Sequence, residues 1–360
     1  MKRALATLAA LLMLAGSARA ETRLYAFPWD EPPEALSDTA MAVLEGERTV
    51  TLTFAGDCTL GGETGGSAKR FAYTAESQGY GYPLINLRPL FSADDLTLVN
   101  LEGVLSDRTL IKTDKEFNFK GKPAYADILA LGGVEAVTLA NNHALDYGAA
   151  GLEDTRAALT AAGLAWCDEA HVLVLDADGV RVGVTASVMG LDRKLFLRQA
   201  ATLRELGCAT IVHVMHMGVE YADTLTAAQV STARFLAEQG VALVVGHHPH
   251  VAQGLAVIDR TTVAYSLGNC VFGGNTDPRD YDACVLSAAF HFLDGALTDT
   301  QATVWPIRVS GDTRRNDYQP VLLSGEDAAR VMDKMQTTSA FALAPFIPGR
   351  GAVQPAVDWR

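Results

Sequence analysis

The chain has 360 residues, of which 49% are hydrophobic and 20% are charged, and its formal net charge at neutral pH is −13. This composition is typical of a globular protein with a sizeable core, and it excludes a disordered or fibrous chain. The acidic balance argues against a general nucleic-acid-binding surface. It also means that an anionic substrate would need a local positive centre, because the overall field repels it.

The first twenty residues are expected to be a secretory signal rather than part of the fold. Lys2 and Arg3 precede an apolar stretch over 4–15, and small residues mark a cleavage point near Ala20. The stretch is short for a membrane span, so an uncleaved anchor is the lesser alternative. Cleavage removes three basic residues and no acid, which changes the net charge from −13 to −16. We therefore expect an exported protein, either periplasmic or extracellular.

The remaining chain is predicted to form one domain with two loosely attached ends. Residues 21–46 contain three prolines and predict an exposed N-terminal arm, and residues 47–340 form the folded domain. Within it, the stretch 63–83 is rich in glycine, tyrosine and small polar residues and predicts a surface loop. Residues 341–360 form a C-terminal tail, and its part over 346–360, again rich in proline and glycine, is predicted to be exposed or loosely attached.

Strands and helices alternate along most of this domain, which predicts a mixed α/β fold. The strands that precede polar clusters are expected over 49–54, 96–99, 136–140, 210–214 and 241–245. The helices between and after them are expected over 84–91, 124–131, 149–162, 197–207 and 226–239. Further strands are expected over 165–166, 172–175, 181–186, 255–258, 262–265, 283–292 and 303–309, with a last helix over 326–334.

Side chains of metal-ligand type follow five of these strands. They are Asp57, Glu102, Asn142 with His143, His216, and His248 with His250. The carboxyl ends of neighbouring strands in such folds gather at one edge, so these side chains are expected to meet. For the histidines of the stretch 246–250, a polar loop is the alternative interpretation. His213 lies inside its strand and is interpreted as a core histidine, and Asp146 is interpreted as a helix cap.

The ligand types favour a catalytic metal centre with one or two divalent ions, which would be manganese, iron or zinc. The ligands are oxygens and imidazoles, and no C-x-x-C thiolate pair accompanies them. A two-metal centre can provide a nucleophile and clamp a phosphoryl group, and His143 would protonate the leaving oxygen. Lys120, Glu220 and Asn269 are the candidate substrate-binding residues. Of the five cysteines, Cys58 and Cys270 flank this site, where packing is the alternative to a functional role.

Seven ordered motifs resemble the CapA family of poly-γ-glutamate capsule synthesis proteins, within the calcineurin-like metallophosphoesterase superfamily. The motifs are GDCTLGG, VNLEGVL, FNFKGKP, LANNHALDYG, HMGVEY, GHHPHV and YSLGNCVF, between about residue 50 and residue 275. The resemblance implies a four-layer α/β/β/α sandwich of two mixed sheets. It also implies His143 as the acid and, as metal ligands, Asp57, Glu102, Asn142, His216, His248 and His250.

Four positions depart from the pattern. The superfamily usually has a histidine where Thr59 stands and a bridging aspartate where Glu102 is the candidate, which puts one metal position in doubt. Within the family, His247 replaces a small residue and Cys270 replaces an aromatic one. Cys270 would either open space near the site or add a soft ligand.

Three functions are consistent with these observations. The first is an exported, metal-dependent hydrolase of the phosphoesterase type, which acts on an anionic polymer or a phosphoester in cell-envelope, capsule or poly-γ-glutamate metabolism. The second is a non-catalytic component of capsule assembly that binds poly-γ-glutamate beside membrane-bound capsule synthesis proteins. The third is a metal-independent acid–base enzyme for a peptide-like substrate. Fold alone does not decide among them, and none of the three involves nucleic acid.

Overall fold

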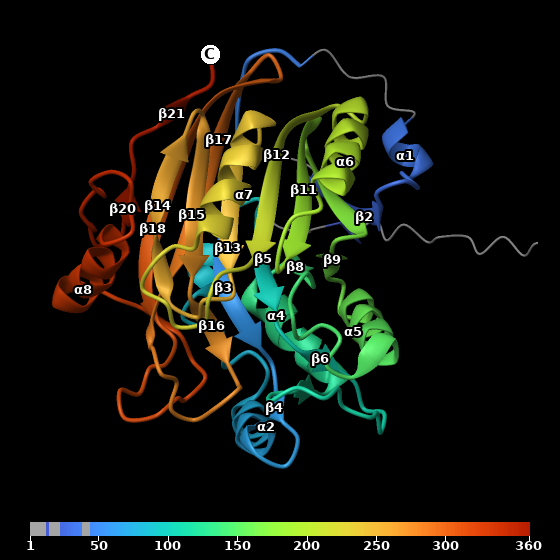
Figure 1. Cartoon of the computed structure of the whole chain (residues 1–360), viewed down its shortest axis with the longest axis vertical. Coiled ribbons are helices and arrows are strands. Elements are labelled where there is room, and N and C mark those ends of the chain that lie inside the picture. The colour runs from blue at the N-terminus through green and yellow to red at the C-terminus, as the bar shows by residue number, and fades with distance from the viewer. Residues whose placement is uncertain (1–11, 14–21, 38–43) are drawn as a thin grey trace, which may run out of the picture.

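The computed structural model describes residues 12–13, 22–37 and 44–360 (Figure 1). The predicted secretory signal lies outside this range, apart from Leu12 and Met13. Within the described ranges, no helix is both long and apolar enough to cross a bilayer.

Two mixed β-sheets form the centre of the structure. The first has the strand order β1 (Leu12–Met13), β2 (Thr22–Pro28), β10 (His171–Ala177), β11 (Val180–Val188), β12 (Cys208–His216), β13 (Leu243–His247), β15 (Thr261–Leu267) and β14 (Ala252–Ile258). The second has the order β19 (Val321–Leu322), β18 (Ala296–Arg308), β17 (Asp282–Leu293), β3 (Glu47–Thr59), β5 (Leu96–Leu101), β8 (Ala136–Thr138) and β9 (Ala165–Cys167).

Shorter strands complete this framework. β16 (Asn269–Phe272) pairs with β3, while β20 (Ala352–Val353) and β21 (Val357–Asp358) pair with β18. A small third sheet has the order β4 (Gly62–Glu63), β7 (Phe119–Gly121) and β6 (Val104–Leu105). The helices are α1 (Glu34–Ser37), α2 (Ser67–Gln78), α3 (Arg88–Phe91), the 3₁₀-helix η1 (Pro123–Tyr125), α4 (Ala126–Gly132), α5 (Gly148–Ala161), α6 (Arg193–Glu205), α7 (Ala227–Glu238) and α8 (Gly325–Gln336).

The core has three apolar layers, because strands in both sheets are covered on both faces. Phe54 of β3 and Val212 of β12 lie in the layer between the two sheets. Ile211, the next residue along β12, points the other way and packs with Phe196 of α6 and Leu236 of α7. Helices α2 to α5 cover the outer face of the second sheet. The α/β prediction and the four-layer α/β/β/α arrangement are therefore confirmed.

The two sheets bring the ends of several parallel strands to one edge of the molecule. β3, β5 and β8 are parallel in one sheet, and β11, β12, β13 and β15 are parallel in the other. The arrows of β3, β12 and β13 point toward the same end of the molecule, where α2 also lies (Figure 1). The polar residues that follow these strands in the sequence therefore converge from both sheets.

Both chain ends are more tightly packed than the sequence predicts. Within the predicted exposed arm, β2 pairs with β10 from Pro28 to Thr22, and Tyr25 and Phe27 are buried. Within the predicted exposed tail, β20 and β21 pair with β18, and Trp359 packs against the core between the sheets. Both predictions of exposure are wrong only in part, because residues 30–35 and 347–350 are mostly exposed. Proline-rich composition does not reveal that β2, β20 and β21 pair with distant strands.

The predicted surface loop over 63–83 is also wrong in part, since it contains helix α2. Phe71 and Ala75 of this helix are four residues apart and buried on the face that packs against the second sheet. The opposite face is polar, and Tyr73 is exposed. The sequence pattern did not reveal this helix, because only two apolar residues mark its buried face and glycines flank it on both sides.

His213 is a core histidine, as predicted. Its Nδ1 lies 2.8 Å from Thr185 Oγ1 and its Nε2 lies 2.9 Å from Ser187 Oγ, and both hydroxyls belong to the neighbouring strand β11. The side chain is fully buried beneath Phe196. Burial lowers the pKa of His213 to about 3.

This lowered pKa predicts a pH dependence of stability. The unfolded chain binds a proton at His213 below its ordinary pKa of about 6.5, whereas the folded protein does so only near pH 3. Stability is therefore lost as pH falls from 6.5, with a slope of about 1.4 kcal/mol per pH unit for this one proton. In His213→Gln we expect the free energy of unfolding, measured with urea between pH 4 and 6, to fall less steeply. If this pH dependence is as steep in His213→Gln as in the natural protein, His213 is not its source.

Candidate metal centre

Four strand ends converge on a buried group of carboxylates and imidazoles. β3 delivers Asp57, β5 leads into Glu102, β12 ends at His216, and β13 leads to His248 and His250, and all of these residues are buried. Carboxylate oxygens and imidazole nitrogens are the ligands that divalent first-row metals prefer in proteins.

Asp57 is held at the centre of the group by several donors. Its Oδ1 accepts a hydrogen bond from Asn100 Nδ2 at 2.7 Å and lies 3.0 Å from His247 Nδ1. Its Oδ2 accepts from the backbone N–H of His248 at 3.3 Å and lies 3.2 Å from His250 Nδ1. Burial raises the pKa of Asp57, but the hydrogen bonds from His247 and His250 outweigh it and hold the pKa well below its usual value. Asp57 is therefore an ionised carboxylate.

Glu102 is equally buried, yet neither of its carboxylate oxygens has a hydrogen-bond partner in the part of the chain that the structure describes. Oε1 lies 3.6 Å from His216 Nε2, 3.9 Å from His250 Nε2 and 4.0 Å from His143 Nε2. Burial raises the pKa of Glu102 to about 7. A buried carboxylate without donors is unfavourable unless a cation or a proton balances it.

These distances fit a metal ion. Ligand atoms about 2.1 Å from one ion stand roughly 3 to 3.5 Å apart, slightly closer than the Glu102–imidazole separations. Asp57, Glu102 and His250 offer ligand atoms that all lie within 4.8 Å of one another. The residues that are present thus fit a divalent cation at this position.

Two further imidazoles are in the neutral form that binds metals. His216 Nε2 lies 2.7 Å from Asn142 Oδ1 and 3.2 Å from His248 Nδ1. Burial lowers the pKa of both His216 and His248, so these rings are uncharged at neutral pH. Asn142, whose amide oxygen belongs to the predicted ligand set, lies beside His216.

The loop after β13 holds its histidines in a strained backbone conformation. His248 has φ 94° and His250 has φ 57°, values that residues other than glycine rarely adopt. Gly246, just before them, allows this approach, because a Cβ there would lie 1.9 Å from the Tyr265 carbonyl oxygen. Such strain persists only where surrounding contacts enforce it, and it occurs most often at functional sites.

His143 is oriented by a buried carboxylate. Its Nδ1 lies 2.7 Å from Asp146 Oδ2, which also accepts from the Phe119 backbone N–H at 2.7 Å. Lys115 Nζ lies 2.9 Å from the other oxygen of Asp146. The interpretation of Asp146 as a helix cap is therefore wrong: the N-cap of α5 is Tyr147, and no side chain caps that end. Asp146 instead fixes the imidazole so that Nε2 faces Glu102.

The candidate substrate-binding residues occupy different places. Asn269 Oδ1 lies 3.0 Å from His250 Nδ1, within the group. Glu220 is exposed and joins His248 and His250 in a second group whose ligand atoms all lie within 4.8 Å of one another. Lys120 lies apart, because its Nζ donates to the Arg108 carbonyl oxygen at 2.9 Å and lies 5.1 Å from the centroid of the Tyr147 ring.

Three residues that support this group were assigned no role from the sequence, although His247 was noted as a departure from the family pattern. Asn100 bonds to Asp57, and Asn141 Nδ2 donates to Asn100 Oδ1 at 2.9 Å, while its own Oδ1 accepts from the His143 backbone N–H at 3.0 Å. His247 bonds to Asp57 from the other sheet. Asn141 and His247 stand directly beside the predicted ligands Asn142 and His248, and Asn100 stands two residues before Glu102. This proximity in the sequence was the only available signal.

Thr59 and Cys270, two of the positions that depart from the superfamily or family pattern, are both buried. Thr59 is buried and its hydroxyl has no hydrogen-bond partner among the described residues. Cys58 and Cys270 are both buried in the apolar layer between the second sheet and its helices. For these two cysteines, the packing alternative is the one that the structure supports.

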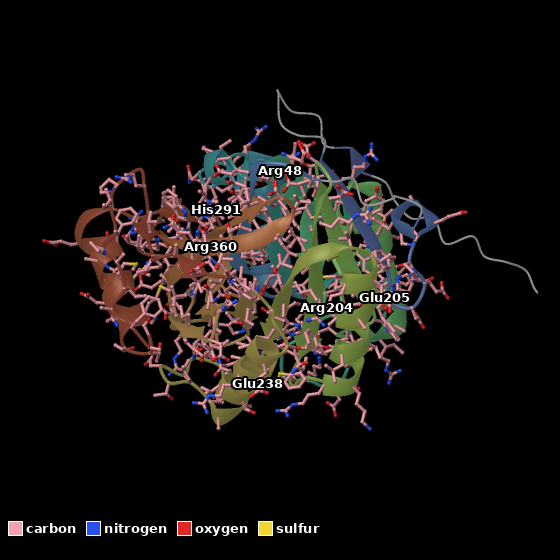
Figure 2. All side chains as sticks on the ribbon, turned by 90° about the horizontal axis from the view of Figure 1, so that it is seen from above. Arg48, Arg204, Glu205, Glu238, His291 and Arg360 are labelled. Carbon is pink, nitrogen blue, oxygen red and sulfur yellow. The ribbon has the colours of Figure 1, made fainter. Side chains whose placement is uncertain are left out.

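The unpaired state of Glu102 makes a prediction about stability. Glu102→Gln removes a buried charge, so in the presence of a chelator the variant should be at least as stable as the natural protein. Mn²⁺ at 100 times its Kd should stabilise the natural protein by about 2.7 kcal/mol and the variant much less. Thermal unfolding with and without Mn²⁺ measures both effects. Glu238→Gln is the matched control, because Glu238 (labelled in Figure 2) ends α7 before β13 begins, whereas the histidines of the site follow the end of β13. An equal response of both variants to Mn²⁺ would refute a metal site at Glu102.

Comparison with known proteins places the chain in a family. A family model described as "Bacterial capsule synthesis protein PGA_cap" matches residues 51–274. The PGA biosynthesis protein CapA of Bacillus subtilis (strain 168) is 25% identical over 283 residues, which cover 71% of each chain. The capsule biosynthesis protein CapA of Bacillus anthracis is 29% identical over 278 residues, which cover 69% of this chain and 65% of that relative. The matched region includes every residue of the candidate centre, and the chain belongs to the PGA_cap family of bacterial capsule synthesis proteins, to which the CapA proteins belong.

Proposed function

We propose that this protein is an exported, metal-dependent hydrolase of the phosphoesterase type that acts in capsule, cell-envelope or poly-γ-glutamate metabolism. The observation that carries the proposal is the buried Glu102 carboxylate, which faces three imidazole nitrogens and has no hydrogen-bond donor among the described residues. The relatives support the biological setting, since one is named for PGA biosynthesis and the other for capsule biosynthesis.

The cofactor in this proposal is one or two divalent ions of manganese, iron or zinc. The side chains that would hold them are Asp57, Glu102, Asn142, His216, His248 and His250. When bound, such ions supply Lewis-acid activation of water and of the oxygens of a phosphoryl or acyl group.

His143 is the proposed proton donor. Asp146 accepts a hydrogen bond from Nδ1, so the proton that can be transferred stands on Nε2, the nitrogen that faces the site. Asp146 also stabilises the protonated ring, as a buried carboxylate does for a catalytic histidine. The leaving oxygen of an ester bound near Glu102 would receive this proton.

An anionic polymer or a phosphoester is the proposed substrate. The guanidinium of Arg279 lies 4.9 Å from the centroid of the Tyr221 ring, which itself lies 5.8 Å from the ring of His250. Arg279 is exposed and makes no hydrogen bond or ion pair with any described residue, so its donors are available to a planar oxyanion. Together with bound ions it would provide the local positive centre that an acidic protein needs.

The second candidate is a non-catalytic role in which the same site binds poly-γ-glutamate for membrane-bound capsule synthesis proteins. The relatives' names favour it, because they describe biosynthesis and not hydrolysis. The two candidates differ in whether a bound substrate is turned over.

Turnover by the Mn²⁺-loaded protein tests the proposal, with bis(p-nitrophenyl) phosphate and γ-glutamyl oligomers as substrates. We expect His143→Ala to lower kcat by about 10²- to 10⁴-fold, the usual contribution of a general acid, with the metal content unchanged. The control is His291→Ala, because His291 lies at the opposite end of the molecule (Figure 2) and pairs with Thr49 at the start of β3.

Two results would count against a metal-dependent hydrolase. If γ-glutamyl oligomers bind without turnover, and His143→Ala and His291→Ala bind them equally well, the non-catalytic role is favoured. If activity persists after a chelator has removed the metal from the protein, the metal-independent acid–base enzyme is favoured.

A further inference from the structure

We propose that Glu220 is a metal ligand, which forms an outer metal position with His248 and His250 beside the buried group of Asp57, Glu102 and His250. The inference rests on the proposed function in requiring divalent ions at this site. It adds a second position, on the solvent side, with a ligand that the sequence pattern suggested only as a substrate contact.

The geometry supports the position directly. One ligand atom from each of Glu220, His248 and His250 lies within 4.8 Å of the other two. His248 and His250 are buried whereas Glu220 is exposed, so the carboxylate closes the group from the solvent side. His250 belongs to both groups, so the inner and outer positions are neighbours. A neutral imidazole has one free lone pair, so His250 would serve only one of the two ions when both are bound.

Two backbone hydrogen bonds hold the segment of Glu220 against the histidine loop. Met217 N donates to the His247 carbonyl oxygen at 3.0 Å, and Tyr221 N donates to the Pro249 carbonyl oxygen at 2.7 Å. Glu220 lies between these two attachments. A Cβ on Gly218 would lie 2.9 Å from Pro249 Cγ, so glycine permits this close approach. The position of Glu220 beside His248 and His250 is thus built into the backbone.

Tyr221 adds a second restraint. Its φ of 58° places it in the left-handed region. Its ring lies between Arg279, whose guanidinium carbon is 4.9 Å from the ring centroid, and His250, whose ring centroid is 5.8 Å away. The turn that carries Glu220 is therefore fixed by packing as well as by hydrogen bonds.

The charge balance of the site also favours a cation at Glu220. Its carboxylate makes no hydrogen bond or ion pair with any described residue, although two imidazoles lie beside it. Asp57, Glu102 and Glu220 together place three carboxylates around one site. A single divalent ion leaves this group net negative, whereas two make it net positive. An anionic substrate requires the second arrangement.

Titration of the metal-stripped protein with Mn²⁺, followed by electron paramagnetic resonance and calorimetry, tests the assignment without any substrate. The natural protein should bind two ions. Glu220→Gln should bind one ion as the natural protein does and the second ion at least 10- to 100-fold more weakly. Even the loss of a residue that hydrogen-bonds to a metal ligand weakens metal binding by that much. Glu220→Asp, which retains the carboxylate, should recover part of the lost affinity.

Asp223→Asn is the matched control, because Asp223 is an exposed carboxylate three residues further along the same segment. It should bind Mn²⁺ as the natural protein does. Unchanged binding by Glu220→Gln would overturn this assignment and leave the proposed function intact. Equal weakening in both variants would also overturn it, because a general charge effect would then suffice. A natural protein that binds no Mn²⁺ would overturn both proposals. Circular dichroism confirms that each variant is folded.

Discussion

The burial of two carboxylates, Asp57 and Glu102, at the edge shared by two sheets is the constraint on which the rest of the site depends. Asp57 is balanced by donors from both sheets, Asn100 on one side and His247 on the other. Glu102 has imidazoles around it but forms no hydrogen bond with any residue in the described ranges. A protein tolerates an unbalanced buried carboxylate poorly, so the site is built to receive positive charge.

The sandwich architecture is what makes this arrangement available. In a single sheet, only neighbouring strand ends can share a ligand. Here β3 and β5 belong to one sheet and β12 and β13 to the other, and their carboxyl ends meet. Asp57 is fully buried even though it lies at the end of its strand. The low local dielectric that results strengthens every charge interaction at the site.

Strain and packing then set the direction of the individual imidazoles. His248 and His250 adopt left-handed backbone conformations, and Asp146 fixes the ring of His143. These restraints are made by backbone and by side chains outside the ligand set, such as Gly246 and Asn141. A ligand set held in this way loses little freedom when an ion or a substrate binds, which favours tight and selective binding.

In the sequence by itself, the alternation of apolar strands and polar strand ends determined the α/β class and most of the candidate site, and seven ordered motifs indicated the family. This worked because parallel strands within a sheet share one direction, so that Asp57 and Glu102 arrive at one edge of their sheet and His216 and His248 at one edge of the other. The packing of the two sheets brings these edges together. Tertiary structure alone decided the rest. The pairing of β2 with β10 and of β20 with β18 joins segments far apart in the chain, and no local pattern records such a partner. In the same way, Asn100 and His247 were selected by what lies across the site from them, a relation that only the folded chain creates.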